Sequence, residues 1–249
     1  MADPIHQFEL KTIGAPLFKI GGSDIVLTNS ALFMFGAVAF IVALMLMGTS
    51  ARSIVPSRIQ SVVEMLYEFV ADTVRSSAGH DGMKFFPLVF SLFIFILVLN
   101  LAGMIPGGFT VTSHLIVTAA LASLVILTVI VYGIMAHGAK FFGLFVPSGV
   151  HPLMLLILVP IEVISFISRP ISLSVRLFAN MLAGHIALKI FAGFIGSLLA
   201  AGAWGLLSPL PLALTVALTA LEVLVAVLQA YVFATLTSLY LHDALHPGH

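Results

Sequence analysis

The sequence contains no cysteine and few charged residues, which make up only 8% of its 249 positions. The absence of cysteine excludes disulfides, thiolate metal sites and a cysteine nucleophile. A soluble domain carries about a quarter charged residues, so this composition also excludes a water-soluble fold. Lys+Arg and Asp+Glu number 10 each, and nucleic acid is excluded as a partner because its binding needs a basic excess.

Several functional motifs are also absent. The sequence has no glycine-rich phosphate loop, nucleophile elbow or metal-ligand cluster. We therefore expect the chain itself to hydrolyse no nucleotide and to bind no cofactor or metal. The first 30 residues lack the basic-then-apolar order of a cleavable signal peptide, and we expect 1–30 to form an exposed N-terminal arm.

Apolar residues are abundant at 61% and are gathered into long stretches. A helix needs about 20 apolar residues to cross a bilayer. Stretches of this length or more occupy 31–49, 84–105, 115–136, 152–199 and 207–242. The sequence therefore predicts an all-α integral membrane protein with about five crossing helices, arranged as a single membrane domain over 1–249.

The segment 56–78 has a different pattern, in which apolar residues recur at helical spacing opposite charged ones. Such a helix is typical of the membrane surface or of contact with a partner helix. The alternative is an ordinary amphipathic connector without a function of its own. In either case we expect a helix outside the hydrocarbon core.

Basic residues indicate the orientation of the chain. Arg52, Arg58, Arg75 and Lys84 all fall between the first two spans, whereas the turn at 106–114 has no Lys or Arg. Since loops rich in Lys and Arg stay in the cytoplasm, we expect the amphipathic helix there and the N-terminus outside. Five crossings then place the C-terminus in the cytoplasm. The lack of a targeting peptide favours a bacterial inner membrane, although chains encoded in organelles also lack one.

The stretch 152–199 is too long for an upright span. At 1.5 Å per residue it would form a helix of about 70 Å, more than twice the hydrocarbon thickness. Either the helix is strongly tilted, or it breaks at Pro160 or Pro170, which weaken the backbone hydrogen bonding. The Ser-Pro-Leu-Pro at 208–211 predicts a hairpin before the second long helix.

Polar side chains recur along one side of this stretch. Glu162, Arg169 and Arg176 are spaced by seven, which keeps them within about 20° per step of one another on a helix. Ser172 and Asn180 lie one turn either side of Arg176. A charge at mid-membrane costs about 2.5–3.5 kcal/mol, so a set of them indicates a function. The alternative for Arg169 and Glu162 is a structural ion pair.

The residue types suggest different roles. Arginine stays protonated, so Arg176 suits a gate or a counter-charge. His185 and Glu222 change protonation state and suit a proton relay, and Gln229 follows Glu222 at the same seven-residue spacing. Lys189 is expected to extend its ammonium to water or lipid headgroups.

The segment 169–185, RPISLSVRLFANMLAGH, resembles the signature of the subunit a family of F-type ATP synthases. NLAGMIP at 100–106, Glu162, and Glu222 with Gln229 extend the resemblance, which covers most of the chain from Ala31 onward. The family has two long helices strongly tilted against a rotating ring of c subunits. The resemblance implies that Arg176 is the essential stator arginine that displaces the proton from each ring carboxyl.

The resemblance also implies two offset half-channels that couple H⁺ flow to ring rotation and ATP synthesis. The outer half-channel would be lined by Asn180, His185, Glu222 and Gln229. The cytoplasmic half-channel would be approached by Glu162 and Ser172, with Arg169 in a supporting position. Na⁺ is the alternative ion, because ligands on the c subunit largely decide that selectivity.

The implied partners are the c-ring, the peripheral-stalk b subunits, the rest of the ATP synthase complex and membrane lipid. Two other classes of protein remain as alternatives. A secondary ion-coupled transporter also has charges within the membrane, but it usually shows two related halves, which this sequence lacks. A structural membrane subunit would have charges that pair off with one another.

Overall fold

The computed structural model of the chain describes residues 9–13, 18–20, 23–50, 56–105, 108–146 and 151–245. Parts of the predicted N-terminal arm lie outside these residues, as do Arg52 of the predicted cytoplasmic connector and Pro106 of the NLAGMIP motif.

Five helices in the described residues are long and apolar enough to cross a membrane. They are α1 (Asn29–Ser50), α3 (Phe86–Gly103), α4 (Leu115–His137), α5 (Pro152–Ala200) and α6 (Pro209–Leu245). A helix satisfies its backbone N–H and C=O groups internally, as hydrocarbon requires. These helices confirm the predicted class, an all-α integral membrane protein.

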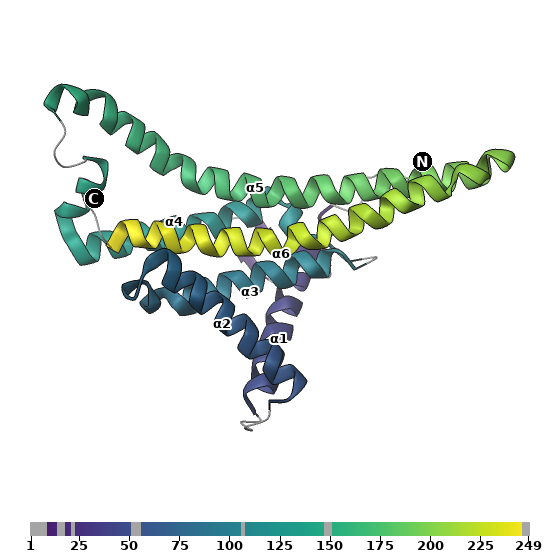
Figure 1. Cartoon of the computed structure of the whole chain (residues 1–249), viewed down its shortest axis with the longest axis horizontal. Helices are drawn as coiled ribbons and strands as arrows, with labels where there is room; N and C mark the ends of the chain where they lie inside the picture. The colour runs from purple at the N-terminus through teal and green to yellow at the C-terminus, as the bar shows by residue number, and fades with distance from the viewer. Residues whose placement is uncertain are drawn as a thin grey trace. The chain divides into compact units, whose positions relative to one another are not determined.

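Helix α5 continues through both of its prolines (Figure 1). It runs for 49 residues with Pro160 and Pro170 inside it, so the predicted alternative of a broken helix is wrong. Each proline removes a single N–H donor from the ladder, and the bonds of the turns on either side remain. The connection after α5 contains the short helix η5 (Gly202–Leu207), and α6 begins at Pro209, since the first helical position needs no N–H donor.

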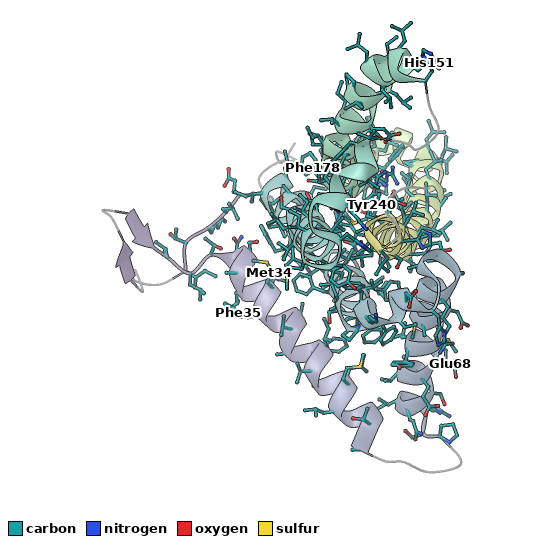
Figure 2. The ribbon with its side chains drawn as sticks, turned by 90° about the vertical axis from the view of Figure 1, so that its left-hand side faces the viewer. Met34, Phe35, Glu68, His151, Phe178 and Tyr240 are labelled. Atoms are coloured by element: carbon teal, nitrogen blue, oxygen red, sulfur yellow. The ribbon has the colours of Figure 1, made fainter. Side chains whose placement is uncertain are left out.

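The amphipathic segment forms helix α2 (Arg58–Ala78), and both ends of the helix have a local cause. The Ser57 side chain accepts a hydrogen bond from the Gln60 backbone N–H at 3.3 Å, which caps the N-terminus. Gly79 ends the helix at a φ of 68°, in the left-handed region that favours glycine. The apolar side is buried at Val63, Val70 and Val74, while Glu68 is exposed on the other side (Figure 2).

The described part of the N-terminal arm includes a hairpin that the sequence did not predict. Strand β1 (Phe18–Ile20) pairs antiparallel with β2 (Ser23–Ile25). A strand of three residues is too short to show a recognisable alternation of apolar and polar residues in the sequence.

The chain divides into two compact units. Unit 1 comprises Met1–Ile41, Phe95–His114 and Leu177–Gln229, and unit 2 comprises Val42–Ile94, Leu115–Arg176 and Ala230–His249. The core of unit 1 includes the fully buried Leu99, Val111, Leu177, Met181 and Ala226.

Aromatic contacts join neighbouring helices of unit 2. The Tyr67 and Phe86 rings join α2 to α3 with centroids 4.6 Å apart. Phe85, in the short helix η2 (Asp81–Phe85), meets Tyr132 of α4 edge to face at 4.6 Å. Such edge contacts between rings add about 0.5–1.5 kcal/mol to the burial of their area.

Candidate functional site

The central feature of unit 1 is a buried acid and base on α5 and α6. His185 Nδ1 lies 3.4 Å from Glu222 Oε1, and the two residues are only 8% and 4% exposed. This separation is longer than a strong hydrogen bond, but it is short enough for the two groups to exchange a proton after a small movement.

Gly184 makes room for this pair. A Cβ atom added at Gly184 would lie 2.7 Å from Glu222 Oε1 and 3.1 Å from its Cδ, closer than side-chain atoms normally approach. A glycine is therefore needed at this position for Glu222 to keep its place beside His185.

Replacing Gly184 with alanine should leave the folded chain less stable than Gly193→Ala does, because both changes raise helix propensity equally, whereas only the methyl group at 184 displaces the buried Glu222 carboxylate. The free energy of unfolding in detergent micelles measures this effect. Gly193→Ala is the matched control, since no atom lies within 4 Å of a Cβ at that position on the same helix. Equal unfolding free energies for the two variants would contradict the prediction.

A second polar contact joins the same two helices. Asn180 Nδ2 donates to Gln229 Oε1 at 3.0 Å. On α3, Asn100 Nδ2 donates to the Ala226 carbonyl oxygen at 3.2 Å, one turn of α6 from Glu222 and from Gln229. Both Glu222 oxygens, Gln229 Nε2 and Asn100 Oδ1 are buried without a hydrogen-bond partner in the described part of the chain. Buried polar atoms are nearly always bonded, so this group has unused capacity to bind and pass protons.

A cavity of about 360 Å³ opens onto His185. It is lined by Met104, His185, Leu188, Lys189, Ala192, Thr215 and Thr219. Lys189, expected from the sequence to reach water or headgroups, contributes to the cavity wall. The cavity therefore gives His185 an approach from one side, through a mostly apolar wall in which Lys189, Thr215 and Thr219 are the other polar residues.

The connection between α3 and α4 reaches the same pair. Thr110 Oγ1 lies 3.0 Å from His185 Nε2. His114, at the end of this connection, stacks on Phe109 with ring centroids 5.1 Å apart. Burial lowers the pKa of His114, so its ring is neutral at pH 7. A role for Thr110 was not predictable from the sequence, because a single threonine in a loop has no distinguishing pattern.

Arg176 belongs to unit 2 and is exposed on α5. Its Nη2 atom lies 3.5 Å from Ser172 Oγ, a weak contact one helical turn away. No carboxylate among the described residues forms an ion pair with Arg176. The guanidinium therefore presents an uncompensated positive charge on the surface of α5.

Arg169 has a partner that the sequence analysis missed. Its Nη1 atom donates to Asp243 Oδ2 at 2.8 Å, and its guanidinium lies 5.1 Å from the Tyr240 ring centroid. The structural ion pair considered for Arg169 is thus present with Asp243 as its partner, whereas Glu162, of intermediate exposure, forms no ion pair with any described residue. Asp243 had a detectable signal, because an acidic residue in the last turn of a helix is unfavourable unless it is paired.

The last turn of α6 is also attached to α4. His137 Nε2 lies 3.0 Å from the carbonyl oxygen of Leu245. Unit 2 thus fixes the end of α6 at two points, one on α5 and one on α4.

Comparison with known proteins gives consistent matches. The family model described as ATP synthase A chain matches residues 31–242. The chain is 67% identical over 247 residues to the ATP synthase subunit a of Methylobacterium sp. (strain 4-46), covering 99% of this chain and 98% of the relative. It is 64% identical to that of Mesorhizobium japonicum and 62% identical to that of Xanthobacter autotrophicus, each over 248 residues and 99% of this chain, with 98% and 99% of those relatives covered.

Proposed function

The chain belongs to the ATP synthase A chain family, and we propose that it is the stator subunit that passes protons to and from the c-ring of a rotary ATP synthase. The observation that supports this most directly is the buried His185–Glu222 pair beside a cavity. A buried carboxylate within a membrane span marks an ion pathway by default. The protein is a multi-pass membrane protein, and its relatives are bacterial.

The outer half-channel runs through unit 1 in this proposal. Protons enter by the cavity and reach His185, which exchanges them with Glu222. Gln229 and Asn180 continue the polar path along α6 and α5. The unpartnered polar atoms of Glu222 and Gln229 support this route, because each is free to bond to a passing proton carrier.

Arg176 acts on the ring in this proposal and carries no proton. A fixed positive charge close to a ring carboxyl favours the ionised carboxylate, so the carboxyl releases its proton when it reaches the arginine. The cytoplasmic half-channel lies towards Glu162 and Ser172, and Arg169 supports it through its ion pair. The membrane potential supplies about 2.3 kcal/mol per charge per 100 mV to drive the ring.

The proposed orientation places the N-terminus outside and the C-terminus and α2 in the cytoplasm, as the distribution of Lys and Arg indicates. The lengths of α5 and α6, 49 and 37 residues, support a strong tilt, since both exceed an upright span. We treat 1–249 as a single membrane domain, because the boundaries between the two units fall inside α1, α3, α5 and α6, whereas domain boundaries usually fall in linkers. The b subunits are further partners in this assembly.

Accessibility of the cavity from outside tests the proposal. The chain has no cysteine, so Thr219→Cys introduces its single thiol at the cavity wall. Right-side-out vesicles are treated with a membrane-impermeant methanethiosulfonate reagent, inverted, and assayed for ATP-driven proton pumping. We expect Thr219→Cys to lose most of its pumping after treatment, because a bulky charged group then fills the path to His185.

Val216→Cys is the matched control, since Val216 lies one turn away, is 63% exposed and does not line the cavity. It should pump equally with and without the reagent. A fully labelled Thr219→Cys that pumps normally would contradict an outer path through this cavity.

A further inference from the structure

Thr110 contacts the ring nitrogen of His185 that does not face Glu222. Its Oγ1 lies 3.0 Å from His185 Nε2 and is buried. The same oxygen lies 3.5 Å from the Gly103 carbonyl oxygen, to which it donates. The hydroxyl thus connects the end of α3 to the imidazole of α5, and all three residues belong to unit 1.

The surroundings of Thr110 fix its side chain in this position. A Cβ atom added at Gly103 would lie 3.0 Å from both Oγ1 and Cγ2 of Thr110, so the glycine leaves the space that this side chain occupies. Ser113 Oγ donates to the Thr110 carbonyl oxygen at 2.6 Å, which holds the backbone of the connection. The hydroxyl is therefore held from the backbone side as well as by its own hydrogen bonds.

A hydroxyl has one proton to donate and two lone pairs that accept. When the Thr110 proton points to the Gly103 carbonyl, its lone pairs are left to accept the Nε2–H of His185. The tautomer of a histidine is set by the hydrogen bond that one ring nitrogen makes. Nδ1 is then the nitrogen that faces Glu222 Oε1, at 3.4 Å.

We propose that Thr110 is a positioning residue for proton exchange, because its hydroxyl accepts Nε2–H and keeps Nδ1 of His185 directed at Glu222. This inference rests on the proposed function, and it adds a residue on a third segment to the outer half-channel. Thr110 itself gains and loses no proton; it acts through His185.

Proton transfer between Glu222 and His185 conserves protons and charge in this arrangement. The O–H bond of the Glu222 carboxyl breaks and an Nδ1–H bond forms, which gives a carboxylate and an imidazolium; the return step reverses both changes. Thr110 Oγ1 accepts Nε2–H in each state, so the ring does not turn over between them. Without the hydroxyl, the neutral ring is free to carry its proton on Nδ1, and that tautomer cannot accept a proton from Glu222.

Substitution of Thr110 tests the inference in the assembled complex. Thr110→Val keeps the shape of the side chain and removes the hydroxyl, whereas Thr110→Ser keeps the hydroxyl. We expect Thr110→Val to lower ATP-driven proton pumping about fivefold in inverted vesicles with normal assembly, the size expected for one lost hydrogen bond. Thr110→Ser should restore most of the rate.

Thr112→Val is the matched control, because Thr112 lies two residues away, is fully buried, and its hydroxyl has no hydrogen-bond partner among the described residues. It should pump at the unmodified rate. Thr110→Ala replaces Thr110→Val in the comparison with Thr110→Ser if the valine variant does not assemble.

Three results would overturn the inference: normal pumping by the variant without the hydroxyl, equal loss in Thr110→Ser, or equal loss in Thr112→Val. A Glu222→Gln variant assayed in the same vesicles distinguishes failure of the Thr110 inference from failure of the proposed function. If Glu222→Gln pumps normally, the proposed function fails; if it does not pump while Thr110→Val does, only the positioning role of Thr110 fails.

Discussion

Replacing Arg176 with alanine should reduce ATP-driven proton pumping to background while the complex still assembles. A unit charge about 4 Å from a ring carboxylate is worth about 4 kcal/mol at an effective dielectric constant of 20. In the proposed mechanism, loss of this charge leaves the ring carboxyl protonated as it passes the stator, so rotation no longer requires release of the proton. Pumping is measured in inverted vesicles, with assembly checked by the amount of the complex in the membrane.

The surface position of Arg176 makes this variant informative. The side chain is exposed and forms no ion pair with a described carboxylate, so alanine leaves no buried charge without a partner, and folding is little affected. Arg75→Ala is the matched control, because Arg75 is an exposed arginine of α2 paired with Asp72 at 3.3 Å. Exposed pairs of this kind contribute about 0–1 kcal/mol, and the control should pump normally.

Pumping by Arg176→Ala near the unmodified rate would remove the stator role from this residue. The two alternatives from the sequence would then return, a secondary transporter or a structural subunit. Loss of the complex from the membrane, in contrast, would mean that Arg176 contributes to assembly.

Glu222→Gln should also reduce pumping to background. Glutamine has nearly the shape of glutamate and fills the same space opposite Gly184, but it neither releases nor takes up a proton at physiological pH. Removing a group that transfers protons typically lowers a rate by about 10²–10⁴-fold. Initial rates of ATP-driven pumping in inverted vesicles measure the change.

Glu68→Gln provides the comparison for this variant. Glu68 is an exposed carboxylate on α2 (Figure 2), where the same chemical change should leave the pumping rate unaltered. If Glu222→Gln retains a substantial rate, pumping does not need this carboxyl, and the proposed function, which passes protons through the His185–Glu222 pair, fails.

The class of fold and the main helices were predictable because the membrane imposes a simple rule. A span needs about 20 apolar residues, and α1 and α4 follow from unbroken apolar runs that the sequence shows directly. The seven-residue spacing of polar residues on α5 likewise singled out Arg176. His185 and Glu222 were predicted as a relay, and the structure places them 3.4 Å apart.

Other features depend on contacts between distant parts of the chain. The pairing of Arg169 with Asp243 spans 74 positions, and the contact of Thr110 with His185 spans 75. No local pattern encodes such distances. The continuity of α5 through its prolines was also undetermined, because the sequence shows that each proline removes one donor but not whether the neighbouring turns keep their hydrogen bonds.

The Arg169–Asp243 ion pair can form only late in the synthesis of the chain. Asp243 is synthesised 74 residues after Arg169, which at about 5–20 residues per second is a delay of roughly 4–15 s. During that delay the arginine does not have this partner. A chain that ends before Asp243 therefore lacks the carboxylate that neutralises Arg169 in the folded protein.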